Sequence, residues 1–331
     1  MVWLFAWLCS TRFLRRMENE KWGIFNSPFS IRPRYLLLIY QDMIKPFLQR
    51  TLPLLATLPF FATPTAQAAT PLHAAKSAHF APLLADPLEP RVAVEPFLGE
   101  KSLQLDIGTT EELYRNDKGT FAAGVDFATW SLLRRSNNFK FPVDAIDYLF
   151  GVNASWKMPL QNSSLPFDDF NVRARLSHIS AHFEDGHYQN GQWLQQAEWQ
   201  GTIPFVYSRE FVNVVLALSA PEHRIYTGYQ YLYNALPSGI NPHSWQAGVE
   251  IATTNTTYVA ADMKLLPIWQ TKQAETEGFR ASWNFQAGMR LKGKQADKVR
   301  LVANYYTGMS RHGMYFYHPE NYSTIGAIID F

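Results

Sequence analysis

One short segment near the middle of the chain brings together side chains that can perform acyl transfer. His178, Ser180 and His182 are spaced two residues apart, and Glu184 and Asp185 follow them. Residues at i and i+2 of a β-strand point to the same side, so an imidazole there lies beside a hydroxyl. The imidazole can act as general base for a serine nucleophile when a third group orients the ring. Ser180 and His178 are therefore the candidate catalytic residues.

The third group is not identified by the sequence. Four acids or amides lie near in the chain, namely Glu184, Asp185, Gln195 and Glu198. The alternative interpretation is that the segment contributes only polar girdle and loop structure, since three-residue patterns of this kind arise by chance. Two adjacent acids are typical of a solvated turn rather than of a calcium site.

The elements that must position these residues are β-strands. In Arg280 to Leu291, Trp283, Phe285 and Met289 share an apolar face, and Asn284 and Gln286 share a polar one. Strict alternation is typical of a strand, and helical spacing cannot produce it. The same pattern predicts about twelve strands, with a range of ten to fourteen. They cover residues 101–108, 119–127, 148–158, 170–181, 205–218, 224–233, 244–252, 258–266, 280–291, 298–306 and 322–331, with a weaker one near 313–317.

Such strands build either a soluble sandwich or barrel with its apolar face inside, or a transmembrane barrel with its apolar face on lipid. Strands of roughly 9–12 residues can cross a bilayer on a tilt. The polar faces are rich in Gly, Asn, Gln and Ser, which suits a lumen. Aromatic residues gather at the ends of the apolar faces, as interfacial girdles do. These aromatic residues are Tyr148, Trp156, Trp245, Trp283 and Tyr305. We therefore expect an all-β fold, a single closed antiparallel transmembrane β-barrel, with His178 and Ser180 on its lipid-facing side.

The C-terminal segment, "STIGAIIDF" from Ser323 to Phe331, predicts closure of that barrel. Backbone groups in hydrocarbon must all be paired, so the last strand has to join the first. Thr324, Gly326, Ile329 and Phe331 also resemble the C-terminal signal of bacterial outer-membrane barrels. The resemblance implies that a barrel-assembly machinery recognises this strand.

The N-terminal 68 residues have the pattern of an export signal. Met43 is followed by two basic residues, an apolar stretch from Leu52 to Phe61 and the exit Ala66-Gln67-Ala68. We expect residues 43–68 to be a cleaved signal peptide, and residues 1–42 to be an over-extended start, the alternative being a genuine cytoplasmic extension. Residues 69–98 then form a periplasmic lead-in, and residues 99–331 form the barrel.

Composition excludes several classes of function. Cys9, the only cysteine, lies in the doubtful N-terminal stretch, so the exported chain has no disulfide or thiol chemistry. Residues 1–68 contain 8 of the 30 basic and 3 of the 28 acidic residues, which leaves the exported chain with a net charge of −3. Nucleic-acid binding therefore has no support. Because the chain has no glycine-rich phosphate loop and no metal-ligand spacing of His or Cys, we expect no cofactor and no metal.

Several stretches resemble a bacterial outer-membrane family known as domain of unknown function 1207. They are Leu84–Val94, Arg173–His187, Tyr207–Ser219, Ser244–Ala252, Tyr258–Leu265, Asn304–Tyr317 and the terminal strand. The resemblance covers most of residues 84–331 and implies a barrel in the bacterial outer membrane, while it leaves the activity open. One departure is "GMYFY" from Gly313 to Tyr317, where the family tends towards "GQFY".

Two functions follow as hypotheses. The first is a non-enzymatic barrel in envelope structure or narrow solute passage. The alternative is a lipid-acting acyl hydrolase, because outer-membrane phospholipase and lipid A deacylase have a similar His-x-Ser on the outside of a barrel strand. The expected partners are outer-membrane lipid and the barrel-assembly machinery. Arg209 and Glu210 are expected to pair with each other in the lumen or at its rim.

Overall fold

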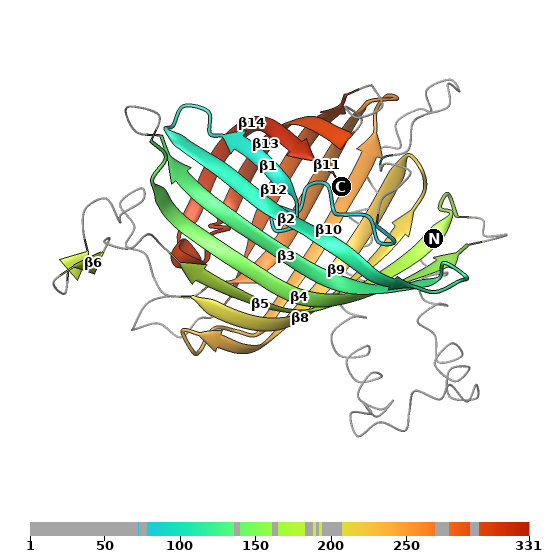
Figure 1. Ribbon diagram of the computed structural model, residues 1–331, viewed down its shortest axis with the longest axis horizontal. Coiled ribbons are helices and arrows are strands. Elements are labelled where there is room, and N and C mark those ends of the chain that lie inside the picture. The colour runs from blue at the N-terminus through green and yellow to red at the C-terminus, as the bar shows by residue number, and fades with distance from the viewer. Residues whose placement is uncertain are drawn as a thin grey trace. The chain divides into compact units, whose positions relative to one another are not determined.

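Twelve antiparallel strands form a closed barrel in the computed structural model of the protein (Figure 1). The structure describes residues 72, 78–135, 140–160, 165–182, 188–189, 192–193, 207–268, 278–291 and 298–330. These belong to one compact unit, Gln67–Phe331. Each strand of the barrel pairs with the strand before it in the chain, and β14 pairs back with β1. The predicted fold class is therefore confirmed.

The strands of the barrel differ in length, and β1 is the shortest. Their bounds are β1 Val92–Pro96, β2 Ser102–Arg115, β3 Phe121–Arg134, β4 Val143–Pro159, β5 Asp169–His182, β8 Ser208–Ser219, β9 His223–Leu236, β10 His243–Ala252, β11 Thr257–Pro267, β12 Phe279–Arg290, β13 Val299–Met309 and β14 Pro319–Ile329. Two short strands between β5 and β8, β6 Tyr188–Gln189 and β7 Gln192–Trp193, pair with each other. Within the described ranges, none of the helical segments has the length and apolar character needed to cross a membrane.

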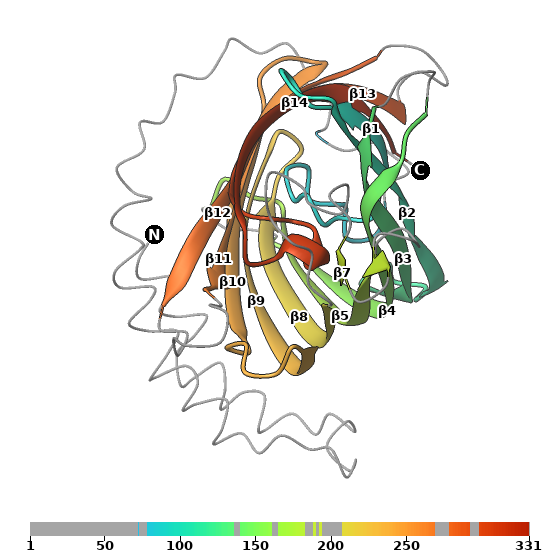
Figure 2. The ribbon, with the colours of Figure 1, turned by 90° about the vertical axis from the view of Figure 1, so that its left-hand side faces the viewer.

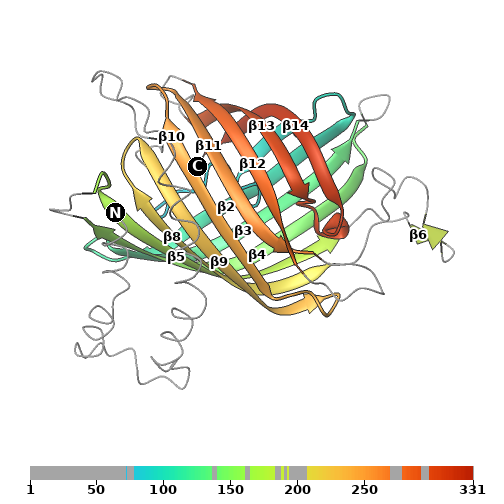
Figure 3. The ribbon, with the colours of Figure 1, turned by 180° about the vertical axis from the view of Figure 1, so that it is seen from behind.

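The side chains of the barrel wall are distributed with the polarity that the alternation predicts. On β12, Trp283, Phe285 and Met289 are 38%, 45% and 42% exposed on the outer face, whereas Asn284 and Gln286 are 4% and 2% exposed inside. Figure 3 shows the part of the wall from β8 to β14 to which β12 belongs. An apolar exterior around a polar interior is the arrangement of a barrel built for lipid.

Two details of the strand prediction are wrong. Residues 313–317 do not form a strand, because Gly313–Tyr315 is a 3-10 turn in a loop that folds inward. The first strand is β1, which lies within the segment expected to be a periplasmic lead-in. The barrel therefore begins at Val92 and not at residue 99. Residues before Val92 also differ from a lead-in, since Asp86 and Glu89 are buried among side chains of the barrel interior.

The barrel closes where β1 pairs with β14. Val92, Ala93 and Val94 pair with Ile329, Ile328 and Ala327. The seam leaves no room for a side chain at Gly326, where an added Cβ would overlap the carbonyl oxygen of Val94 and lie 2.8 Å from the Cα of Glu95.

Three residues of the predicted assembly signal, Thr324, Gly326 and Ile329, lie on β14 at or beside this seam. Thr324 and Gly326 face inward, and Asn304 donates a 3.2 Å hydrogen bond to the Thr324 hydroxyl. Ile329 faces outward and is 39% exposed. Phe331 lies outside the described residues.

Residues 78–91, the inner segment, fill part of the lumen. Figure 2 shows this segment and the loop after β13 within the ring of strands. Wall side chains bind the backbone of the inner segment: Arg224 donates to the carbonyls of Ala81 and Pro82, and Asn284 donates to that of Ala85. These hydrogen bonds satisfy polar groups on both partners, as a buried chain requires.

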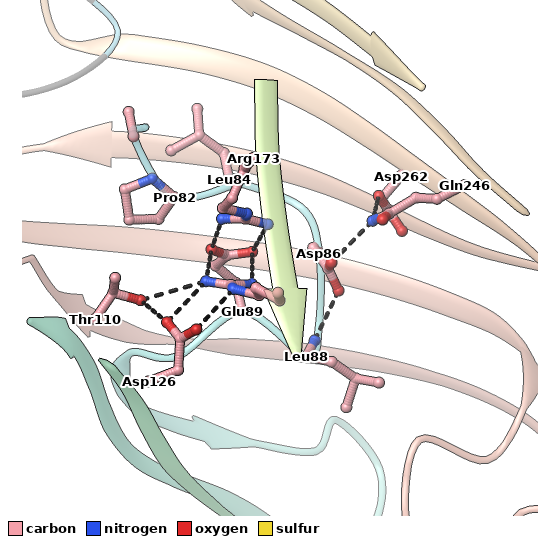
Figure 4. A network of polar contacts seen from close by, with 12 residues as sticks. Pro82, Leu84, Asp86, Leu88, Glu89, Thr110, Asp126, Arg173, Gln246 and Asp262 are labelled. Atoms are coloured by element: carbon pink, nitrogen blue, oxygen red, sulfur yellow. Dashed lines mark hydrogen bonds and ion pairs between the residues drawn. The ribbon is translucent and has the colours of Figure 1, made fainter. Parts of the chain in front are cut away.

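Ion pairs with the wall also hold the inner segment in the lumen (Figure 4). Glu89 receives hydrogen bonds from both Arg173 and Arg175 on β5, and the Arg173 Nη2–Glu89 Oε2 distance is 3.0 Å. Arg175 also bonds Asp126 on β3. Farther round the wall, Asp86 pairs with Lys264 and accepts a hydrogen bond from Gln246. The charges of the inner segment thus pair with charges of the wall.

The β13–β14 loop, residues 310–318, fills another part of the interior. Arg311 pairs with Asp106 at 3.0 Å, and the backbone N–H of Gly313 donates to Asp147 at 2.8 Å. Met314 and Tyr315 are fully buried against residues of β3, β4 and β5. Together the inner segment and the β13–β14 loop fill much of the barrel interior.

The seam geometry predicts that Gly326→Ala destabilises the barrel. The new methyl group overlaps the β1 backbone, which cannot move aside without breaking the ladder, so we expect a loss of about 1–3 kcal/mol, as overpacking costs. Urea unfolding of the refolded protein, followed by its mobility in unheated gels, measures the loss. Gly228→Ala is the control, since the nearest atoms there are side-chain atoms of Val215 and Gln246 at 3.2–3.3 Å. Equal effects of the two variants would contradict the role of Gly326 in closure.

The lumen network predicts a large effect for Glu89→Ala. Removing this carboxylate leaves Arg173 buried without its partner, and breaking a buried pair typically costs about 3–5 kcal/mol. The same unfolding measurement applies. Asp169→Ala is the control because Lys157 and Asp169 form a pair whose side chains are 41% and 21% exposed, and exposed pairs contribute about 1 kcal/mol or less. A loss at Glu89 no larger than at Asp169 would show that the inner segment is not held by these charges.

Candidate functional site

The candidate site lies on the outer face of β5, at its C-terminal end. The alternation puts Arg173, Arg175 and Ser177 inside, and it puts His178 and Ser180 outside. Both predicted residues are thus on one face, as the sequence indicates. Their cross-strand neighbours are Tyr148 and Ser208 beside Ser180, and Phe150 and Glu210 beside His178. Paired side chains of this kind have Cβ atoms about 4.5–5.5 Å apart.

The hydrogen bonds of the site connect four side chains in two pairs. The Ser180 hydroxyl is bonded to Nε2 of His182 at 3.1 Å. Nδ1 of His178 is bonded to Oε1 of Glu210 at 2.8 Å. His182 also contacts the Tyr148 ring edge-on, with centroids 5.5 Å apart. Ser180 therefore shares the outer face with His178 and His182, and its hydroxyl is bonded to His182 rather than to His178, the predicted partner.

Glu210 determines which ring nitrogen of His178 carries the proton. A carboxylate accepts hydrogen bonds and does not donate them, so Nδ1 of His178 carries the proton in this contact. When the ring is neutral, its Nε2 is then the unprotonated, basic nitrogen. This is the tautomer that a general base requires, and the arrangement is the one in which an acid orients a catalytic histidine.

The carboxylate bonded to His178 belongs to a residue that the sequence did not point to. Glu184, Asp185, Gln195 and Glu198 all lie outside the described residues. Glu210 follows His178 by 32 positions and reaches it only because β5 pairs with β8 in this register. The sequence offered one signal for Glu210, because Arg209 and Glu210 form a charged pair at the start of a predicted strand, in "YSREF".

The expected pairing of Arg209 with Glu210 is wrong. The two residues are consecutive on a strand, so they point to opposite faces. Glu210 is outside with His178, whereas Arg209 is inside, bonded to the Tyr207 hydroxyl at 2.9 Å.

The site borders the apolar belt of the barrel. One step along the strands from His178 and Glu210, the outer face carries Leu176 and Val212, which are 48% and 39% exposed, and Phe150 beside His178 is 53% exposed. Among the described residues there is no cluster of three or more His, Cys, Asp or Glu that could hold a metal ion.

A family model described as protein of unknown function (DUF1207) matches residues 62–331. The chain belongs to this family. The match includes all twelve barrel strands, the inner segment and the candidate site, and it begins within the predicted signal peptide. The family resemblance seen in the sequence is confirmed.

Solved outer-membrane barrels have a similar fold. Outer membrane phospholipase A from Escherichia coli is 11% identical with a TM-score of 0.52, over 74% of this chain and 93% of that one. The calcium-bound dimer of the Salmonella typhi phospholipase is 10% identical with the same TM-score and coverage. A form of the Escherichia coli enzyme with an active-site asparagine replaced by alanine is 12% identical with a TM-score of 0.52, over 76% and 94%. Identities this low show the fold alone. No curated protein matches the sequence at a significant level.

Proposed function

We propose that the protein is a lipid-acting acyl hydrolase of the bacterial outer membrane, with Ser180 as nucleophile and His178 as general base. The observation that supports this most is that Ser180, bonded to His182, shares the lipid-facing side with His178, whose ring is bonded to Glu210. Ionisable groups on a membrane-facing surface are costly, which favours a functional role for them. The likeness to outer membrane phospholipase A is consistent with the proposal.

The reaction would proceed through an acyl-enzyme. The Ser180 Oγ attacks the ester carbonyl carbon while its proton passes to Nε2 of His178. His178 then gives that proton to the alcohol oxygen as the carbon–oxygen bond of the ester breaks. Water repeats the sequence and releases the fatty acid.

His178 is assigned as the base because, among the described residues, it is the one of these two imidazoles with a carboxylate on its other nitrogen. In this mechanism the Ser180 hydroxyl has to turn from His182 towards His178 when substrate binds. Catalytic hydrogen bonds often form only when substrate is bound, so the resting contact with His182 does not exclude this role.

The position of the site on the barrel points to lipids of the outer leaflet. The longest connections, residues 183–207 and 268–278, leave the barrel at the end where β5 terminates. In outer-membrane barrels the longer loops are extracellular. An acyl ester at that level places its chains on Leu176, Phe150 and Val212 and its carbonyl beside Ser180.

Export and assembly belong to the same proposal. The signal at residues 43–68 would direct the chain out of the cytoplasm. Thr324, Gly326, Ile329 and Phe331 would bind the barrel-assembly machinery before the seam closes. The outer membrane would then be the site of action.

The non-enzymatic function, envelope structure or narrow solute passage, has less support for its passage version because the inner segment and the β13–β14 loop fill the interior. We expect planar bilayers containing the protein to show no steady conductance. Glu89→Ala, which frees the inner segment from β5, is expected to produce conductance events. Steady conductance of the unmodified protein would favour passage over hydrolysis.

The hydrolase proposal predicts that the purified barrel in detergent releases fatty acid from phospholipid or lipopolysaccharide. Ser180→Ala should lower the rate by about 10³-fold or more, because the nucleophile is lost. Ser208→Ala is the matched control, since Ser208 is the cross-strand neighbour of Ser180. No release by the unmodified protein in any condition would remove the enzymatic function.

The roles of the two histidines predict unequal losses. His178→Ala should slow hydrolysis by about 10²–10⁴-fold, the usual contribution of a general base. Glu210→Gln should also lower the rate, but by a smaller factor than His178→Ala. His182→Ala should have the smallest effect of the three. A reversed order for His178 and His182 would assign the base to His182 and leave the nucleophile unchanged.

A further inference from the structure

A cavity of about 100 Å³ lies inside the barrel, separate from the site on the outer face. It is bounded by the inner segment, by the start of the β13–β14 loop and by the inward side chains of the wall. Five cations line it, namely Arg173, Arg175, Arg209, Lys264 and Arg311. Asp86 is the one carboxylate among its lining residues.

Donors without partners gather around this cavity. Five of its lining side chains have a buried polar atom that makes no hydrogen bond within the described part of the chain. These atoms are Trp130 Nε1, Arg173 Nε, Ser177 Oγ, Arg209 Nε and Arg311 Nε. Four of the five can only donate, and the serine hydroxyl can also donate. An unsatisfied buried donor is unfavourable, and several around one space indicate an acceptor that belongs there.

The cations around the cavity bind carboxylates of the fold, with one exception. Arg173 and Arg175 bind Glu89, and Arg175 also binds Asp126. Lys264 pairs with Asp86, and Arg311 pairs with Asp106. Arg209 has no carboxylate partner among the described residues. Its contacts are the hydroxyl and ring of Tyr207 and the ring of Phe211.

From these observations we propose that the cavity is a binding site for a small oxyanion, such as phosphate or the carboxylate of a small organic acid. An anion supplies both the acceptors that the free donors lack and the negative charge that Arg209 lacks. Charge-assisted hydrogen bonds from guanidinium groups to such oxygens are among the stronger ones in proteins. A volume of about 100 Å³ admits an ion of a few heavy atoms, since one water takes up about 30 Å³.

Arg209 is the residue on which recognition depends most. The other cations already bind carboxylates of the fold, so their substitution would also disturb the lumen network. Arg209 packs against Tyr207, with its guanidinium carbon 4.8 Å from the ring centroid, which holds it beside the cavity. Its replacement removes a cation and leaves no carboxylate of the described chain unpaired.

The test is calorimetric titration of the full barrel in detergent with inorganic phosphate, with acetate and, as a neutral probe, with glycerol. We expect phosphate, acetate or both to bind and glycerol not to bind. Binding of phosphate alone or acetate alone would identify the class of oxyanion. Arg209→Gln should weaken binding by about tenfold or more, as expected when a charged hydrogen bond is lost.

Arg115→Gln is the matched control, because it removes the same charge from a side chain that is 48% exposed and paired with Glu112. We expect its affinity to stay within about twofold of the unmodified protein, since exposed pairs contribute little. Unheated gel mobility checks that each variant is folded. Absence of binding by every oxyanion, or equal affinity in the Arg209→Gln and unmodified proteins, would show that the cavity holds water only and overturn the proposal.

Discussion

The requirement that every backbone N–H and C=O in hydrocarbon find a partner underlies the whole structure. It forces the sheet to close, and closure depends on β1 pairing with β14. Closure in turn divides the side chains into two sets, because each strand must point alternate residues at lipid and at the interior. The apolar outer face, the polar lumen and the position of Ser180 on the outside all follow from that division.

A polar lumen creates a second constraint, which the inner segment meets. The wall contributes Arg173 and Lys264, and among the described residues their carboxylate partners lie on the inner segment. Glu89 and Asp86 provide these carboxylates. The inner segment is therefore part of the folded barrel and not an appendage to it. Its carboxylates balance the charges of wall cations. Arg209, which is bonded to the Tyr207 hydroxyl, has no carboxylate partner among the described residues.

Features that depend on residues close together in the sequence could be predicted, and features that depend on residues far apart in the sequence could not. Alternation is local, so eleven of the barrel strands and the outward placement of His178 and Ser180 could be inferred directly. β1 was missed because "VAVEP" is short and ends in proline, which gives little periodic signal. Gly313–Tyr315 was misjudged because its apolar residues are buried by an inward loop instead of by a strand.

The pairing of His178 with Glu210 could not be predicted from the sequence. It depends on the register between β5 and β8, which are separated by a long connection. Register is a property of the assembled sheet, and no local pattern encodes which outward residue of one strand meets which of the next. The filled lumen escaped prediction for the same reason, since Arg173 and Glu89 are 84 positions apart.

The short first strand has a consequence for how the wall fluctuates. β1 pairs with β14 through Val92, Ala93 and Val94, and a single bridge between Phe97 and Thr324 continues the seam, whereas β13 and β14 pair along their whole length. Local opening of a folded protein takes place where the fewest bonds must break. We therefore expect local opening of the wall to be concentrated at β1, where a transient slot would connect the barrel interior sideways with the surrounding bilayer. A molecule could pass between the interior and the bilayer through this slot without either end of the barrel opening.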